Sequence, residues 1–335
     1  ATGYPNPFGV SAIVSTWGNN DLDWQKTIDQ NYGIDLAFLN NRLKVTVDYF
    51  YKNTDPLLVY VQTPTSTGTS TVPMNLGKQV SQGLTATLNY MILQRENMSW
   101  NFNFNARHIT YEYRNIGTAL DKFNQENRSS NLVRYYDGGS PSDLWAVRSA
   151  GIDPASGQEV YIKKNGNYTF AYDKNERVEV GNTNPMLEGS LFTSLSYGGF
   201  TLNVTAAYKF GGDIYNTTLA NKVEYIDPYG NVDRRAFTER WKKPGDLVRF
   251  LGIPENVSDE NRYSERFVER DNTFAITSIM LNYEFKPGYL RKIGIKRLNL
   301  GIGVADIARF SSVKQERGTE YPFQRSFHIT FRPTF

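Results

Sequence analysis

The chain has 335 residues with 37 basic and 34 acidic side chains, a net charge of +3, no Cys and two His. The lack of Cys excludes a disulfide scaffold and thiolate chemistry, and two His far apart argue against a His-rich metal site. The nearly balanced charge argues against nucleic acid as a partner. Aromatic residues are the unusual feature, with 22 Tyr and 20 Phe.

No stretch approaches the roughly 18 consecutive apolar residues of a transmembrane helix. The mean hydropathy of −0.51 is typical of a soluble protein. A transmembrane β-barrel has the same hydropathy, however, because its strands are apolar only at alternate residues and its loops are polar. The first residues, ATGYPNPF, carry no initiator Met and no basic region of a signal peptide, so we expect the chain to be processed or truncated there.

Nine segments alternate apolar and polar residues, the period of a β-strand with one apolar face. The last segment, RSFHITFRPTF, keeps the alternation to Phe335, whereas the ends of soluble domains usually fray. We therefore expect one face of these strands to meet an apolar medium. In chain order the segments lie within residues 32–38, 42–52, 84–92, 100–107, 187–197, 200–210, 273–285, 297–305 and 325–335.

The connections between these segments alternate in length. Short turns are expected near residues 40–41, 94–98, 198–199 and 286–288. Long connections are expected over residues 54–75, 114–182, 212–263 and 306–323. This alternation predicts an all-β, antiparallel transmembrane barrel with short periplasmic turns and long extracellular loops.

Polar faces of the early strands are expected to line the barrel interior. They comprise Asn31, Asp35, Thr46, Asp48, Thr85, Thr87, Asn89, Asn101, Asn103, Asn105 and Arg107. Several aromatic residues are expected at strand ends, where amphipathic rings suit the membrane boundary, with Phe335 at the periplasmic interface. The others are Tyr32, Trp100, Tyr197, Phe200, Tyr208, Tyr283 and Phe285. The alternative is a soluble β-sandwich, in which aromatics simply favour strands.

Four stretches resemble the SusC/RagA-type TonB-dependent transporters. They are GNNDLDWQKTIDQNYGIDLAFLNNRLKVTVDYFYKNTDPLL (18–58), DLWAVRSAGIDPASGQEVYI (143–162), DRRAFTERWKKPGD (233–246) and YPFQRSFHITFRPTF (321–335). Their order along the chain matches that of the family, and they extend from one end of the chain to the other.

The resemblance implies a 22-stranded outer-membrane barrel with an N-terminal plug, working with a SusD-like surface lipoprotein. It implies import of an oligosaccharide or a peptide, driven through TonB, and a C-terminal Phe335 read by the barrel-assembly machinery. Nine strands cannot close such a barrel. We therefore expect residues 1–335 to be its C-terminal part, with the plug and about 13 earlier strands outside this chain.

Aromatic residues of the long loops are the best candidates for contact with solute or lipoprotein, because sugars stack on rings and interface cores favour Tyr and Trp. Packing within the loops is the competing interpretation. The candidates are Tyr135, Tyr136, Trp145, Tyr161, Tyr225, Tyr229 and Trp241. We interpret the basic segment 234–243 as a solvated loop, and Asp21 and Asp23 as turn residues rather than a catalytic or calcium pair.

No motif for catalysis, phosphate binding or metal binding is present, so the sequence predicts neither an enzyme nor a cofactor. The favoured function is nutrient import across a bacterial outer membrane. The expected partners are the lipoprotein, TonB, the rest of the barrel and membrane lipid. A passive porin or adhesin, and a soluble carbohydrate-binding β-protein, remain as alternatives.

Overall fold

The structure is a computed structural model. It describes residues 2–6, 9–13, 18–63, 66, 68–69, 71–118, 120–121, 124, 134–226, 232–253, 262–285, 287–290, 294–314 and 325–335. Antiparallel strands dominate this part of the chain. None of the helices in it is long and apolar enough to cross a membrane.

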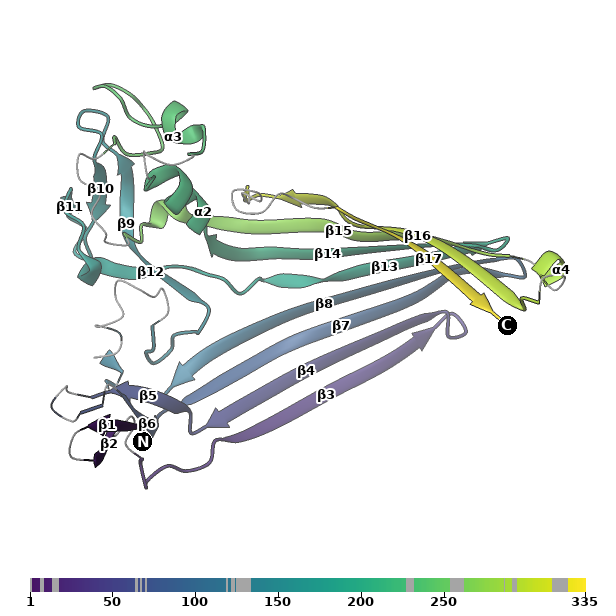
Figure 1. Cartoon of the computed structure of the whole chain (residues 1–335), viewed down its shortest axis with the longest axis horizontal. Helices are drawn as coiled ribbons and strands as arrows, with labels where there is room; N and C mark the ends of the chain where they lie inside the picture. Colours follow the sequence, from purple (N-terminus) through teal and green to yellow (C-terminus); the bar gives the residue numbers. More distant parts are fainter. Residues whose placement is uncertain are drawn as a thin grey trace.

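Nine long strands form one sheet in the order β17-β16-β15-β14-β13-β8-β7-β4-β3, with every neighbour antiparallel (Figure 1). The chain thus runs up and down, and the nine-stranded prediction is confirmed. The strands are β3 (Lys26–Phe38), β4 (Leu43–Asp55), β7 (Lys78–Arg95), β8 (Met98–Arg114), β13 (Leu187–Tyr197), β14 (Phe200–Tyr215), β15 (Val268–Glu284), β16 (Arg297–Ser311) and β17 (Ser326–Thr334).

The register gives the sheet two chemically different faces. Across five strands, Asp48 pairs with Thr85, Thr85 with Arg107, Arg107 with Glu188, and Glu188 with Lys209. Paired residues point to the same face, so these five form one polar row. We call this the polar face; Phe50 and Phe192 are exceptions on it.

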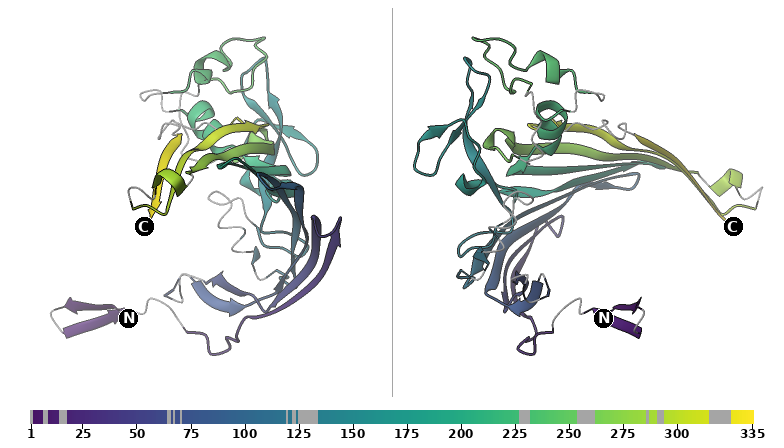
Figure 2. Two further views of the ribbon diagram at one scale, coloured as in Figure 1. Left: turned by 90° about the vertical axis from the view of Figure 1, so that its right-hand side faces the viewer. Right: turned by 60° about the vertical axis from the view of Figure 1, so that its left-hand side comes forward.

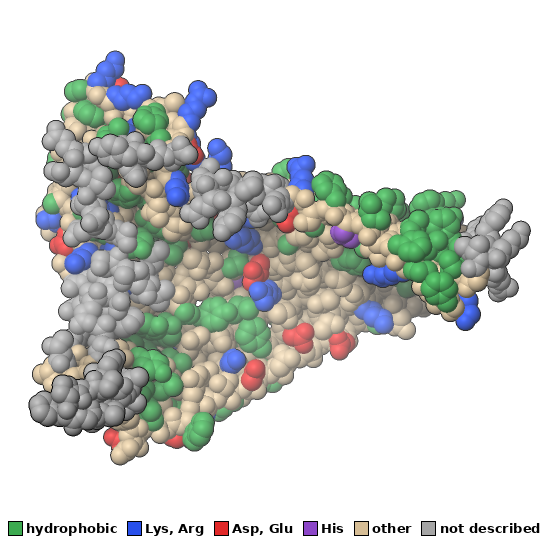
Figure 3. Space-filling view, in the orientation of Figure 1, with side chains coloured by type: hydrophobic (Ala, Val, Ile, Leu, Met, Phe, Trp, Pro, Cys, Tyr) green, Lys and Arg blue, Asp and Glu red, His purple; other side chains and the backbone are tan. Residues whose placement is uncertain are grey.

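The opposite face is apolar and exposed. Its side chains lie on the even residues of β3 and β8 and the odd residues of β17, and Ile34, Phe327 and Ile329 are 62%, 73% and 81% exposed. The sheet curves like part of a barrel wall (Figure 2). Figure 3 looks onto its concave side, where the surface between the two ends is mainly polar with scattered charges. Large exposed side chains of the apolar face include Tyr32, Leu36, Phe38, Leu84, Trp100, Phe200, Leu202, Leu281, Ile302 and Phe331.

Turns and loops alternate between the two ends of the sheet, as the sequence predicts. The β3–β4 turn contains Asn40 and Asn41 with φ of 55° and 64°, and the β13–β14 turn contains Gly198 and Gly199 with φ of 58° and 96°. Asn and Gly tolerate these left-handed conformations best. The β15–β16 connection carries α4 (Pro287–Leu290). The rings of Phe200, Tyr283 and Phe285 cluster at this turn end. The centroid of Tyr283 lies 4.5 Å from that of Phe200 and 4.8 Å from that of Phe285.

The loops contain structure that the sequence analysis treated as irregular. The β4–β7 loop forms the hairpin β5 (Leu58–Gln62) and β6 (Thr71–Asn75). The β8–β13 loop forms a second sheet in the order β11-β10-β9-β12. Its strands are β9 (Asp143–Ile152), β10 (Glu159–Ile162), β11 (Tyr168–Thr169) and β12 (Arg177–Asn182), with the 3₁₀ turn η2 (Lys174–Glu176). The β14–β15 loop holds α2 (Thr217–Leu219), the π-helical turn η3 (Ala220–Glu224), α3 (Arg235–Thr238) and η4 (Glu265–Phe267). A separate hairpin, β1 (Thr2–Asn6) and β2 (Gly9–Ile13), precedes the main sheet.

Two aromatic residues lie away from the positions expected for them. Tyr32 and Tyr208 are in the middle of β3 and β14, because the strands extend further than the alternation alone indicated. The Tyr208 ring stacks on Phe104, and its hydroxyl donates to the carbonyl of Asn105 at 2.9 Å. To reach this carbonyl on β8, the Tyr208 side chain crosses β13 at Gly189. A Cβ at Gly189 would lie 1.9 Å from the Asn105 carbonyl oxygen and 2.8 Å from the Tyr208 hydroxyl.

Gly189→Ala is therefore expected to destabilise the sheet by about 2 kcal/mol, the usual cost of overpacking. Denaturant unfolding of the protein in phospholipid vesicles measures this. Gly18→Ala is the matched control, because a Cβ at Gly18 meets no atom within 4 Å. Equal unfolding midpoints for the two variants would contradict the close packing at Gly189.

Candidate functional site

Two long loops pack together at one end of the sheet. Residues 134–186, which follow β8, and the described residues 216–226, 232–253 and 262–267, which follow β14, gather around β9 and α2 (Figure 1); we call them the loop layer. They share a buried apolar core, since side chains must exclude water to hold loops of this length in one conformation. The core contains Leu144, Tyr215, Leu219, Ala220, Val223, Ile226, Ala236, Phe250 and Phe267.

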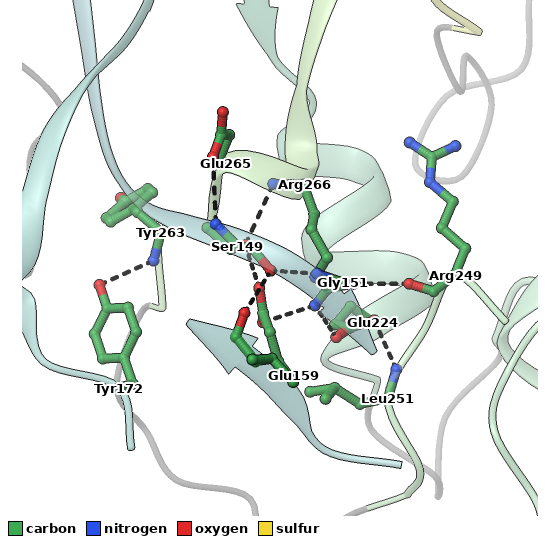
Figure 4. Close-up of polar contacts among 12 residues, drawn as sticks. Ser149, Gly151, Glu159, Tyr172, Glu224, Arg249, Leu251, Tyr263, Glu265 and Arg266 are labelled. Atoms are coloured by element: carbon green, nitrogen blue, oxygen red, sulfur yellow. Dashed lines mark hydrogen bonds and ion pairs between the residues drawn. The ribbon is translucent and has the colours of Figure 1, made fainter. Parts of the chain in front are cut away.

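Backbone groups of the two loops bond directly to each other. The Val147 N–H donates to the Tyr263 carbonyl at 3.0 Å, and the Tyr263 N–H donates to the Tyr172 hydroxyl at 3.2 Å. The Ser149 N–H donates to the Glu265 carboxylate at 3.3 Å. Figure 4 shows the contacts of Tyr263 with Tyr172 and of Glu265 with Ser149. The segment before β15 thus continues the loop sheet beside β9.

A buried ion triad lies under this junction. The Arg266 guanidinium donates to Glu159 at 2.8 Å and to Glu224 at 2.7 Å (Figure 4). The two carboxylates are 1% and 0% exposed, and Arg266 is 9% exposed. Ser264 donates its hydroxyl to Glu159, and Arg266 also donates to the Arg249 carbonyl at 2.7 Å. One Arg therefore joins β10 of the first loop to η3 of the second.

The two carboxylates of the triad are not equivalent. Burial opposes ionisation of Glu159, but hydrogen bonds and attraction from Arg266, with the Ser264 hydroxyl, outweigh it and hold the pKa of Glu159 below its usual value of 4.5. Burial dominates at Glu224 and raises its pKa above 4.5, although Arg266 opposes the rise. Burial also opposes the charge on Arg266, yet the two carboxylates raise its pKa. The loop layer thus contains one firmly ionised acid and one that binds a proton more readily.

The basic segment of the second loop is partly structural. Arg240 is buried and donates to the carbonyls of Val223 and Glu224, both at 2.6 Å, and to the carbonyl of Ala236 at 3.0 Å. Arg235 pairs with Asp233 at 2.9 Å. The solvated-loop interpretation is therefore wrong for Arg240, whose planar donors satisfy carbonyls at the ends of short helical turns.

Three of the candidate aromatics, Tyr135, Tyr136 and Trp145, are half-buried in the first loop. The backbone of Tyr135 bonds to the Asn124 side chain, and its ring is 5.3 Å from that of Tyr113. The Tyr136 hydroxyl bonds to Asp143 and Glu179, and its ring is edge-on to Trp145 at 5.1 Å. Burial, and then the charges and hydrogen bonds of Asp143 and Glu179, raise the pKa of the Tyr136 hydroxyl above its usual range.

Tyr136 and Trp145 line a cavity of about 400 Å³. Lys164, Asn175 and Arg177 also border it. The indole N–H of Trp145 is buried and has no hydrogen-bond partner among the described residues. Rings beside polar donors are a common arrangement for holding a polar solute.

Three of the other candidate aromatics, Tyr161, Tyr225 and Trp241, pack inside the loop layer. Tyr161 is 2% exposed and contacts Tyr172, while Tyr225 packs against the shared core. Trp241 donates its indole N–H to the Pro154 carbonyl at 2.9 Å and covers Gly157. Tyr229 lies outside the described residues. Contact of these residues with solute or lipoprotein stays a prediction, and Tyr161 would first have to become exposed.

The residues expected to line the barrel interior share the polar face. Thr46 donates to Asp35 at 2.6 Å, and Asn103 bonds to Asn89. Asn105 donates to Ser190 at 2.6 Å. Asn101 lies opposite Ser194 in the same register, and Asp48 and Arg107 belong to the charged row. Their contact with a transported solute stays a prediction.

Sequence reasoning missed the other charges of this face. Glu188, Lys209, Asp271 and Arg309 lie near the loop ends of β13 to β16. Lys209 occupies a polar position of an expected strand, which is a signal the sequence contained. Arg309 was expected in the long connection 306–323, but β16 extends to Ser311 and includes it. The buried triad left no such signal, because Glu159, Glu224 and Arg266 lie in the loops, outside the segments in which apolar and polar residues alternate.

The remaining candidates form turns or ends. The Asp23 carboxylate accepts from the Trp24 N–H at 2.9 Å, and the Asp21 N–H donates to the Asn19 side chain at 2.9 Å. Phe335 follows the last residue of β17 and is exposed. In the part of the chain that the structure describes, no group of three or more His, Cys, Asp or Glu could hold a metal ion.

A family model described as "TonB dependent receptor-like, beta-barrel" matches residues 1–253. The chain belongs to this family. TonB-dependent receptors are transporters and not enzymes.

Similar proteins with known names are themselves TonB-dependent receptors. The receptor P39 of Formosa agariphila is 25% identical over 88% of this chain and 33% of its own length. The receptor SusC of Bacteroides thetaiotaomicron is 22% identical over 80% of this chain and 27% of its own length. This chain therefore spans about a third of these relatives.

Solved structures of the RagAB peptide transporter share the fold of this TonB-dependent receptor chain. One matches all of the chain and 38% of its own chain with a TM-score of 0.81 and 18% identity. The "open-open" state of the RagAB peptide importer matches with a TM-score of 0.77 and 19% identity. These likenesses establish the barrel fold for the receptor segment.

Glu159→Gln is expected to weaken the loop layer by about 3 kcal/mol, because it removes the ionised partner of a buried Arg. Hydrogen exchange of residues 143–152 measures local opening of the layer. Glu224→Gln is the matched control and should cost much less, because burial already favours the neutral form of Glu224, whereas it is the ionised form of Glu159 that Arg266 stabilises. Equal losses of stability in the two variants would contradict the conclusion that Glu159 and Glu224 are not equivalent.

The triad also predicts a pH dependence. The raised pKa of Glu224 means that the folded layer binds a proton more readily than the unfolded loop. This group therefore adds stability as the pH falls from neutral toward 4.5. Glu159, with its lowered pKa, contributes stability above 4.5 that is lost only as the pH falls through its folded value. Opening should thus be rarer at about pH 5.5 than at about pH 7.5, and Glu224→Gln should abolish this difference. A difference of the same size in Glu224→Gln would refute the assignment.

Proposed function

We propose that the chain is the C-terminal part of the barrel of a SusC/RagA-type importer, through which nutrients cross the bacterial outer membrane. The two-faced, nine-stranded sheet carries this proposal. Many large apolar side chains are exposed on one face, polar side chains cover most of the concave face, and the large folded loops that the structure describes stand at one end. Membership of the TonB-dependent receptor family supports the same function.

Further strands must complete the barrel. Among the described residues, β3 and β17 each pair with a single neighbour and so have one unpaired edge. Unpaired backbone N–H and C=O groups cost several kcal/mol each in lipid, so membrane sheets close on themselves. The named relatives are about three times as long as the matched segment. We infer that strands preceding this segment close a barrel of about 22 strands and that a plug occupies its interior.

The concave face would form part of the solute path. Asn, Thr and Ser side chains along it offer hydrogen bonds that a hydrated sugar or peptide can exchange in succession. The apolar face would contact lipid, with the aromatic cluster of Phe200, Tyr283 and Phe285 at the periplasmic boundary. This orientation puts the loop layer outside the cell.

The loop layer would receive solute and dock a SusD-like lipoprotein. Tyr136 and Trp145 are the strongest of the aromatic candidates, because they line a cavity and are not enclosed in the core. TonB would act through the plug, outside this segment. The structurally similar RagAB is a peptide transporter, and the resemblance to the SusC/RagA family leaves an oligosaccharide open as well, so the proposal covers both solute classes.

A soluble carbohydrate-binding protein fits the sheet less well. Exposing Ile34, Phe327 and Ile329 together with the rest of the apolar face would create a patch far larger than soluble proteins tolerate.

Uptake by living cells tests the import proposal. Cells with the transporter gene intact or deleted are given a defined mixture of oligosaccharides and short peptides, with and without a protonophore. Mass spectrometry of the medium follows the depletion of each compound. We expect at least one compound to be depleted only when the gene and the proton gradient are both present.

Two other outcomes would contradict the proposal. Depletion that needs the gene but survives the protonophore would identify a passive pore. Identical depletion of every compound with and without the gene would contradict the import proposal as a whole. Purification from native outer membranes provides the matching test of partners, and a lipoprotein should accompany the barrel.

A further inference from the structure

A cavity of about 600 Å³ lies on the polar face just below the loop layer. Four consecutive strands, β13 to β16, and β8 beside them contribute its walls, near the ends from which the long loops leave. Its charged lining consists of Arg107, Glu188, Lys209 and Arg309, with Asn105 and Thr273 between them. A solute that passes from the loops along the concave wall would meet this cavity first.

The charges of the cavity do not cancel. Arg107 pairs with Glu188 at 2.7 Å, and Lys209 pairs with Asp271, whose carboxylate also accepts from the Thr273 hydroxyl at 2.6 Å. Three cations thus face two carboxylates. The cation left over is Arg309.

Arg309 is held without a hydrogen-bonding partner. Its Nε–H is buried and unbonded, and within the described ranges its guanidinium enters no salt bridge. It interacts with Asp271 only at a distance, while Lys209 occupies that carboxylate. The residue lies opposite Ala275, whose methyl group cannot accept a hydrogen bond. Burying a guanidinium donor without an acceptor costs free energy, and an incoming oxyanion would relieve that cost.

The surrounding charge restricts which anion suits this place. Glu188 and Asp271 leave the cavity with a surplus of one positive charge, which a singly charged group neutralises. A phosphate monoester carries nearly two negative charges and would be repelled by both carboxylates. A carboxylate has one charge and two oxygens in a plane, which match the paired donors of a guanidinium.

We propose that the Arg309 cavity binds the carboxylate of the transported solute, so that this importer selects acidic oligosaccharides or acidic peptides over neutral ones. The inference rests on the proposed import function. Arg309 supplies the paired donors, while Lys209 and Arg107 add attraction from their pairs. Asn105 and Thr273 lie within the same wall to receive neighbouring hydroxyl or amide groups.

Paired probes test the selection. The full-length transporter, purified in detergent with its native partners, is titrated with short oligogalacturonates and their methyl esters, and with glutamate-containing peptides and their glutamine counterparts, both amidated at the C-terminus so that the glutamine peptides carry no carboxylate. We expect a carboxylate member to bind about tenfold more tightly than its neutral counterpart, the gain of one charge-assisted bidentate contact. Arg309→Gln should remove that preference.

Two further variants control the experiment. Arg297→Gln changes an Arg on the same strand and the same face but at the turn end, and it should keep the preference. Arg309→Lys keeps the positive charge but loses the paired donors of the guanidinium, so it should retain part of the preference. The same variant replaces Arg309→Gln if Arg309→Gln fails to assemble. The inference is overturned if no carboxylate probe binds better than its neutral counterpart, or if Arg309→Gln and Arg297→Gln behave alike.

Two results separate this inference from the import proposal. Proton-driven uptake that does not depend on the charge of the probe would support the import proposal and contradict the carboxylate site. Carboxylate binding that depends on Arg309 in a protein without energised uptake does the reverse. Arg309→Gln that raises the basal ion conductance of the purified transporter, with no change in probe preference, would assign Arg309 to an internal contact and overturn the proposal.

Discussion

Everything in this molecule depends on the alternation of side chains across paired strands. A strand that puts successive residues on opposite faces can carry two unrelated surfaces, and the register keeps each surface continuous from strand to strand. Val45, Leu88 and Phe104 are paired in one row, while Asp48, Thr85 and Arg107 are paired in another. The wall can therefore be apolar toward lipid and polar toward water although its overall composition is that of a soluble protein.

The loop layer is stabilised in a different way. It has no bilayer on one side, so it builds a small apolar core of its own and encloses charges within it. Arg266 with Glu159 and Glu224 is costly to bury, and such groups stabilise a fold mainly when every donor and acceptor is met. In return the triad admits very few arrangements of the two loops, because a shift of either one leaves a buried charge unpaired.

The sequence was informative wherever contacts are local or periodic. The nine strands, the alternation of turns and loops, and the two faces follow from period-2 patterns and from Asn40-Asn41 and Gly198-Gly199 at the turns. The loop layer was not predictable in this way. Glu159 and Arg266 are 107 residues apart and meet only through tertiary packing, and Tyr161 is polar enough to suit a surface yet is enclosed. The cavity at Arg309 falls between these cases. Lys209 and Arg107 lie at predictable polar positions, but Arg309 was expected in a loop, and the pairing of these charges depends on five strands.

The sharing of one core by two loops also affects how such a protein can diversify. Loops that stand alone can be exchanged between relatives one at a time. Here a new version of residues 134–186 would arrive with a carboxylate at the position of Glu159 or without one, and its companion at 216–267 would have to carry the matching Arg. The heritable unit at the mouth of this barrel is therefore the pair of loops, and recombination within the pair would be selected against even where each half folds well with its original partner.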